Sequence, residues 1–157
     1  MKIHLVDGTY ELFRAYYAQP KRYAPNGQEV GAILGLMRTL IVLLRQADVS
    51  HVACAFDSSI ESFRNTLFSG YKTGDGVPDD LRSQFTLAER ITSALGIVVW
   101  PMTEFEADDA LASAVAKWSS ASQIEQIVIC SPDKDLAQMV TGRYVVCWDR
   151  RRELILD

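Results

Sequence analysis

Three features of the sequence predict an α/β fold in which a mostly parallel sheet carries helices on both faces. Short apolar runs alternate with longer helical patterns along the chain. The short runs are apolar throughout, which is typical of strands that are buried on both faces. The 157 residues, of which 48% are hydrophobic, match one globular domain with one core. We therefore expect a single three-layer domain over residues 1–157.

The first third of the chain provides two strands and two helices. Residues 3–6 (IHLV) form an apolar run that ends at an aspartate, and residues 9–18 are expected to be helical. A loop is predicted at 21–28, where proline, asparagine and glycine occur together. Apolar residues then recur at helical spacing over 30–44, and HVACAF at 51–56 is a second strand.

The middle of the chain is expected to be helical on both sides of a long turn. Residues 58–68 are predicted to be a helix, and 69–80 (SGYKTGDGVPDD) are rich in turn residues. A second helix is expected over 81–95, with Asp79 or Asp80 as its N-terminal cap.

The last third completes the sheet. Residues 97–100 (IVVW) are a third strand, and the stretch FEADDALASAVAKW at 105–118 contains an amphipathic helix. Residues 126–131 are a fourth strand, and 143–148 and 153–156 are expected to pair and close the sheet.

Acidic residues follow the predicted strands. In parallel α/β sheets, ligands bind beyond the carboxyl ends of the strands, so acids placed there should meet in one crevice. Three aspartates come directly after strands, three acids open the helix that follows the third strand, and one more lies just beyond the fourth. The seven residues are Asp7, Asp57, Glu106, Asp108, Asp109, Asp133 and Asp135.

The helix that begins at FEADD carries three acids in its first turn. One acid there is explained by the helix dipole, which favours negative charge at the N-terminus. Asp108, however, lies roughly 60° from Leu111 around the helix, at the edge of the apolar face, so it should be partly buried. Crowded carboxylates repel one another unless a positive charge compensates them. Oxygen ligands without His or Cys suit Mg²⁺ or Mn²⁺, so we expect one metal ion or a pair there.

The net charge supports a phosphate-containing substrate once these acids are set aside. The chain has 20 acids and 16 Lys or Arg residues, a formal charge of −4. Without the seven proposed ligands, 13 acids remain against 16 bases. A mildly basic shell around an acidic, metal-filled crevice would attract phosphates.

Four blocks, LVDGTYELFRAYYA, AFDSSIESFRNTLFSGYK, FEADDALAS and SPDKDLAQMV, resemble the 5′-nuclease family in order and spacing. This family comprises the 5′–3′ exonuclease domain of bacterial DNA polymerase I and the flap endonucleases. The resemblance covers nearly the whole chain. It implies a PIN-like (Rossmann-like) fold and hydrolysis of phosphodiester bonds near DNA 5′ ends and flaps, using two divalent metal ions.

The resemblance also implies roles for individual residues. Asp57, Asp108 and Asp109 would hold or support the first metal ion, Asp133 would lie between the two ions, and Asp135 would face the second. The full set of implied metal ligands is the seven acids named above. The residues expected to act in catalysis are Asp7, Lys72, Asp108 and Asp109.

Basic and aromatic residues match the positions that the family uses on the substrate. Arg14, Tyr71 and Lys72 would contact the scissile phosphate and the terminal nucleotide, because cations offset phosphate charge and tyrosine stacks on bases. Arg64 and Arg82 are further candidates. Without the resemblance, the same residues would be interpreted as solvated charges and a loop anchor.

Three departures from the family pattern leave alternatives open. Asp75 stands near a position that is usually basic, and Pro132 replaces a glycine. The helix-three-turn-helix region, which binds duplex DNA and completes the second metal site, is absent from these 157 residues. The sequence therefore also fits a fragment of a longer protein, a form that works with a partner chain, a non-catalytic nucleic-acid-binding module, or a PIN-type ribonuclease that cuts RNA.

Other classes have less support. A haloacid dehalogenase phosphatase would need an aspartate where Leu5 stands, and no dinucleotide or P-loop motif occurs. No signal peptide or membrane-spanning run is found, so no membrane partner is expected. Cys54, Cys130 and Cys147 lie in apolar runs without metal spacing, which indicates reduced, buried thiols and a cytoplasmic protein.

Overall fold

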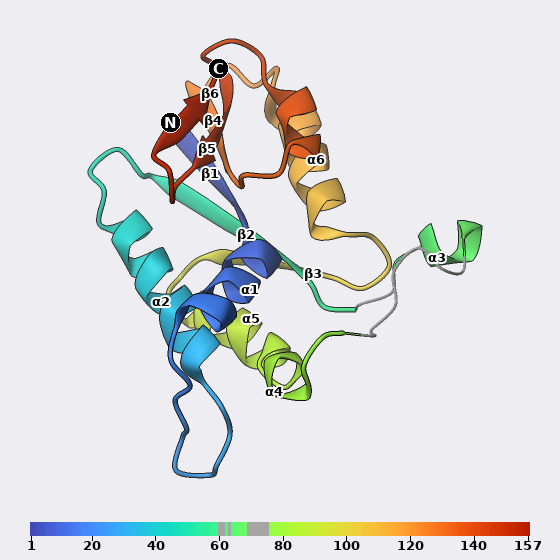
Figure 1. Ribbon diagram of the computed structural model, residues 1–157. Coiled ribbons are helices and arrows are strands. Elements are labelled where there is room, and N and C mark those ends of the chain that lie inside the picture. Colours follow the sequence, from blue (N-terminus) through green and yellow to red (C-terminus); the bar gives the residue numbers. More distant parts are fainter. Residues whose placement is uncertain (60–61, 63, 69–75) are drawn as a thin grey trace.

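The computed structural model describes residues 1–59, 62, 64–68 and 76–157. Within these residues the strands form one mixed sheet with the order β3-β2-β1-β4-β5-β6 (Figure 1). Every neighbouring pair is parallel except β5 and β6, which are antiparallel. The strands are β1 (Lys2–Asp7), β2 (His51–Asp57), β3 (Val98–Met102), β4 (Gln126–Cys130), β5 (Val145–Asp149) and β6 (Leu154–Leu156). The predicted mostly parallel sheet and its closing strand pair are confirmed.

Helices cover both faces of this sheet, as the sequence predicts. Figure 1 shows α1, α2, α4 and α5 gathered on one side of the sheet and α6 on the other. The helices are α1 (Gly8–Ala18), α2 (Gly31–Leu44), α3 (Arg64–Leu67), α4 (Asp79–Arg82), α5 (Phe85–Ala94) and α6 (Ala107–Trp118), with a 3₁₀ turn η1 (Asp135–Met139). The three-layer fold class is therefore confirmed.

The central strands contribute side chains to a hydrophobic core on each face of the sheet, because successive side chains of a strand point to opposite faces. In β1, Val6 packs in the core with α1, α2 and α5, whereas Leu5 packs in the core with α6. In β2, Cys54 packs in the same core as Val6, and Ala55 packs in the same core as Leu5. The central strands β1, β2 and β4 are thus largely buried on both sides, which explains their continuous apolar sequence, whereas the outer strand β3 is partly exposed.

Two predicted helices differ in extent. The segment expected to be helical over 58–68 is helical only at Arg64–Leu67 among its described residues. The helix expected over 81–95 is divided into α4 and α5, and α4 is capped by Pro78 without a side-chain hydrogen bond. Asp79 and Asp80 are the first two residues of α4, so neither is its N-terminal cap, and the Asp80 carboxylate instead pairs with Lys21 at 2.7 Å and accepts a hydrogen bond from Tyr16 at 2.7 Å.

One glycine sets the junction between β1 and α1. A Cβ atom on Gly8 would lie 2.6 Å from a ring carbon of Phe56 and 2.7 Å from Cys54 Sγ. No larger residue fits without displacing β2. This close approach holds Asp7 at the carboxyl end of the sheet. Among the described residues, no helix is long and apolar enough to cross a membrane.

Candidate active site

A cavity of about 220 Å³ lies at the carboxyl ends of the central strands. We call it the acid cavity. Five of the seven predicted metal ligands line it, together with two residues of α1 and the first residue of α6. Its lining residues are Asp7, Thr9, Tyr10, Asp57, Glu106, Ala107, Asp108 and Asp133. The sheet topology brings these residues together from four separate parts of the chain.

Asp7 ends β1 and is only 7% exposed. Its Oδ1 atom accepts a hydrogen bond from the backbone N–H of Tyr10 at 2.9 Å, so it caps α1. Its Oδ2 atom accepts a hydrogen bond from the hydroxyl of Ser131 at 3.1 Å. Burial raises the pKa of Asp7 to about 7, and the nearby Asp108 and Asp57 act in the same direction against the two hydrogen bonds.

Asp108 is half-buried at the edge of the apolar face of α6, as its helical position predicts. Burial raises its pKa to about 6, and the neighbouring Asp133, Asp57, Glu106 and Asp109 add to the effect. Each of these influences opposes ionisation. Asp108 therefore lies at the centre of the negative charge of the acid cavity.

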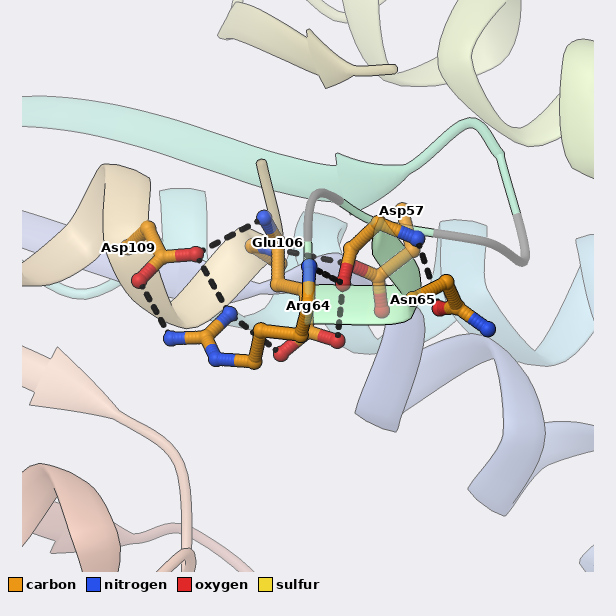
Figure 2. Close-up of polar contacts among 7 residues, drawn as sticks. Asp57, Arg64, Asn65, Glu106 and Asp109 are labelled. Carbon is orange, nitrogen blue, oxygen red and sulfur yellow. Dashed lines mark hydrogen bonds and ion pairs between the residues drawn. The ribbon is translucent and has the colours of Figure 1, made fainter. Parts of the chain in front are cut away.

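Asp109 faces a different environment, because Arg64 of α3 pairs with it (Figure 2). The guanidinium donates two hydrogen bonds to the Asp109 carboxylate, both at 2.8 Å, and one to Glu106 at 2.9 Å. This arginine holds the pKa of Asp109 below its usual range. The Asp109 Oδ2 atom also accepts the backbone N–H of Glu106 at 2.9 Å, which caps the first turn of α6.

The remaining acids differ in position. Asp57 Oδ1 accepts the backbone N–H of Ala107 at 2.8 Å, which fixes the start of α6 against β2. Asp133 is exposed at the rim of the acid cavity, and its Oδ1 atom accepts the backbone N–H of Asp135 at 2.8 Å. Asp135 is also exposed and, like Asp109, is not among the residues that line the cavity.

The predicted substrate residues that the structure describes lie outside the lining of the acid cavity. Arg14 is on α1, where its guanidinium pairs with Glu11 and donates to the Thr39 hydroxyl at 3.2 Å. Arg82 is exposed on α4. Arg64 engages the two acids at the start of α6, and Tyr71 and Lys72 lie outside the described residues.

The sequence did not single out Thr9, Tyr10 or Ser131, although all three border the acids. Thr9 and Tyr10 line the acid cavity, and Ser131 is 2% exposed and donates to Asp7. Burial is the main cause of the raised pKa of Tyr10. Their closeness to the ends of β1 and β4 is the signal that could have identified them.

The donor set of the acid cavity suits a hard divalent cation. It consists of carboxylates and the Thr9 and Tyr10 hydroxyls, and two of its carboxyl groups have raised pKa values that a bound cation would lower. Over the described ranges, no three His, Cys, Asp or Glu side chains already form a group that could hold one ion.

The fold and the site define an α/β domain with a mostly parallel sheet and a cluster of acids at the carboxyl edge of that sheet. Comparison with known proteins identifies the family. Residues 2–156 match the family described as "5′-3′ exonuclease, N-terminal resolvase-like domain". The chain is 37% identical over 139 residues to DNA polymerase I of Pseudomonas aeruginosa, which covers 88% of this chain and 15% of that protein. It is 36% identical over 137 residues to the 5′-3′ exonuclease of Buchnera aphidicola, covering 87% of this chain and 45% of that protein.

This chain therefore belongs to the 5′-3′ exonuclease family and corresponds to its N-terminal resolvase-like domain. It spans less than half the length of both relatives. Solved structures show the same fold. One of them is a bacteriophage T5 flap endonuclease in a pseudo-enzyme–product complex with DNA and metal ions. It superimposes with a TM-score of 0.67 at 16% identity, and the match covers 99% of this chain and 57% of that chain. A T5 5′-exonuclease with bound zinc gives a TM-score of 0.64 at 17% identity, with 99% and 58% coverage.

Proposed function

We propose that the chain is the catalytic part of a metal-dependent 5′–3′ exonuclease or flap endonuclease that hydrolyses phosphodiester bonds near DNA 5′ ends. The acid cavity is the observation that carries this proposal. It gathers five carboxylates from four segments at one sheet edge, and burial raises the pKa of two of them. Membership of the 5′-3′ exonuclease family supports phosphodiester hydrolysis as the reaction, and the T5 flap endonuclease complex with DNA supports DNA as the substrate.

The residues proposed to hold divalent ions are the acids of the cavity, with Asp109 and Asp135 at its outer side. Mg²⁺ and Mn²⁺ are the proposed ions, and bound there they would lower the pKa of a water and offset phosphate charge. Asp7 and Asp57 fix the starts of α1 and α6, so they also keep the acid cavity in shape. Arg14, Tyr71 and Lys72 are proposed to contact the DNA, with Arg64 and Arg82 as further candidates.

The chemistry requires negative groups to remain ionised beside an anionic substrate. Arg64 keeps Asp109 ionised, whereas Asp7 and Asp108 would be fully ionised at neutral pH only with a cation nearby. We propose the cytoplasm as the site of action, where the three buried free cysteines would stay reduced.

Cleavage of a 5′-labelled flap duplex tests the proposal. The wild-type chain is incubated with Mg²⁺, with Mn²⁺ and with EDTA, beside Asp108→Asn and the matched control Glu104→Gln, an exposed acid just before the cavity residues. We expect cutting only with a metal ion, a loss of about 10³-fold or more in Asp108→Asn, and little change in Glu104→Gln. Equal cutting by wild type and Asp108→Asn would remove the acid cavity from the mechanism, and an RNA strand in parallel tests the ribonuclease alternative.

A further inference from the structure

A second cavity, of about 250 Å³, is lined mainly by arginines. We call it the arginine pocket. It lies between α1, α2 and the turn that follows β5, and none of its lining residues is acidic. These residues are Arg14, Arg38, Thr39, Val42, Arg150 and Arg151. Three distant parts of the sequence thus supply positive charge to one concave site.

Arg150 is a rigid part of this pocket. Its side chain is 11% exposed, donates from Nη2 to the carbonyl oxygen of Thr39 at 3.1 Å, and lies over the Trp148 ring at 5.6 Å. Its Nε and Nη1 atoms are buried and have no hydrogen-bond partner in the described part of the chain. Unpaired buried donors on a cation are costly, so an anion in the pocket would relieve a charge that the fold leaves only partly compensated.

The carboxylates around the pocket do not balance its charge. Glu11 is 3% exposed and pairs with Arg14, and its Oε1 atom is 4.0 Å from Arg150 Nη1, which is beyond hydrogen-bond distance. Asp149, at the end of β5, lies 3.7 Å from Arg152, which does not line the pocket. Four arginines therefore face two nearby carboxylates, those of Glu11 and Asp149. Guanidinium groups bind phosphate oxygens in a planar, two-point geometry, which makes a phosphate group the matching ligand.

A third cavity, which we call the connecting cavity, shares lining residues with both the arginine pocket and the acid cavity. It measures about 560 Å³ and is lined by Tyr10, Phe13, Arg14, Tyr17, Ala18 and Arg151. It shares Arg14 and Arg151 with the arginine pocket and Tyr10 with the acid cavity. The three cavities therefore form a series along α1. Aromatic side chains beside cations are the features that bind single-stranded nucleic acid without sequence preference.

We propose that the arginine pocket binds a phosphate group of the nucleic-acid strand, at a position away from the bond that is cut. The strand runs from the acid cavity along α1, with a base against the aromatic residues of the connecting cavity and a phosphate between Arg38, Arg150 and Arg151. This inference rests on the proposed function for the identity of the strand. The phosphate is either the terminal 5′-phosphate or an internal phosphodiester.

Binding of a fluorescent oligothymidine in EDTA tests the pocket separately from cleavage. The double variant Arg38→Ala/Arg151→Ala removes two exposed arginines of the pocket and leaves the buried Arg150 in place. The control Arg45→Ala/Arg152→Ala also removes two positive charges. Arg45 lies at the C-terminal end of α2 and Arg152 follows Arg151 in the turn, and neither residue lines the pocket. We expect Kd to rise about 10-fold or more in the pocket variant and only about 2-fold in the control. In the pocket variant, the slope of log Kd against log salt concentration should also fall by about 1–2.

Oligonucleotides with a 5′-phosphate and with a 5′-hydroxyl identify the source of the phosphate. A loss seen only with the 5′-phosphate assigns the pocket to the strand terminus, and a loss seen with both assigns it to an internal phosphodiester. Equal losses in the pocket and control variants, or no binding by the wild type, would overturn the inference. If the wild type cuts DNA and the pocket variant binds the oligonucleotide normally, the inference about the arginine pocket is wrong and the nuclease proposal stands. If binding depends on the pocket but no DNA is cut, the inference about the pocket is supported and the nuclease proposal is contradicted.

Discussion

Asp7 combines a capping role with a raised pKa in one buried carboxyl group. It caps α1 and accepts the Ser131 hydroxyl, yet burial still raises its pKa to about 7. Asp109, the neighbour of the cavity-lining Asp108, has its pKa lowered by Arg64 instead. The crowded acids at the start of α6 are thus not equivalent, and those that point into the cavity are the ones that a cation would stabilise.

The raised pKa of Asp7 predicts a pH-dependent effect of Asp7→Asn. The unfolded pKa is 3.8 and the folded pKa is about 7, so ionisation of Asp7 lowers the free energy of unfolding as pH rises between these values. An asparagine retains an oxygen for capping and does not ionise. In urea unfolding with EDTA, we expect the stability of Asp7→Asn relative to wild type to increase by about 2 kcal/mol from pH 5 to pH 8.

Asp79→Asn, an exposed acid of α4, is the control for this experiment and should show no such trend. A difference between Asp7→Asn and wild type that stays constant from pH 5 to pH 8 would mean that Asp7 already ionises normally in the folded protein. The cap alone would then explain why an aspartate stands at this position.

At the scale of the elements, Arg64 links the short helix α3 to the start of α6. Its side chain is 31% exposed and binds Asp109 in a two-point geometry. We predict that Arg64→Ala and Asp109→Ala are not additive, with a coupling energy of about 1 kcal/mol after allowance for solvent screening. Thermal or urea unfolding of the two single variants and the double variant measures this coupling.

Arg90→Ala replaces Arg64→Ala in a control cycle, because Arg90 is an exposed arginine on α5. Its coupling to Asp109 should be close to zero. A zero coupling for Arg64 as well would mean that the ion pair does not hold α3 against α6 in solution. Arg64 would then be available as one of the proposed DNA contacts.

The elements that the sequence predicted well are those fixed by local patterns. The apolar strands and the periodic helices α1, α2 and α6 follow from the spacing of hydrophobic residues. The division between α4 and α5 does not follow from such spacing, and a buried glutamine lies at this division. Gln84 is fully buried, donates to Glu29 and to the Asp80 carbonyl oxygen, and accepts the backbone N–H of Ile33. These partners come from other elements, so no local pattern reveals them.

At the scale of the whole molecule, the carboxyl edge of the sheet concentrates charge of one sign. The sequence could predict this edge, because the parallel order places the residue after each strand on the same side. It could not predict that Asp135 would lie outside the lining of the acid cavity or that Tyr10 would line both the acid cavity and the connecting cavity. Those details depend on how η1 and α1 pack beside the strands.

This concentration of charge predicts that metal binding and folding are linked. A ligand that binds only the folded state stabilises it, by about 2.7 kcal/mol at 100 times its Kd, which corresponds to about 5–10 °C in Tm for a domain of this size. We expect Mg²⁺ to raise Tm by several degrees at pH 8, relative to NaCl of equal ionic strength. At pH 5 the rise should largely disappear, because Asp7 and Asp108, with pKa values of about 7 and about 6, are then protonated.

Differential scanning fluorimetry of wild type, Asp108→Asn and Glu104→Gln at both pH values separates a specific site from general screening. Screening by a divalent cation would raise Tm in all three proteins and would persist at pH 5, since it does not depend on one carboxylate. A specific site would lose the rise in Asp108→Asn and keep it in Glu104→Gln. Because the readout is stability, a rise confined to pH 8 and dependent on Asp108 would establish the metal site even if these 157 residues do not cut DNA by themselves.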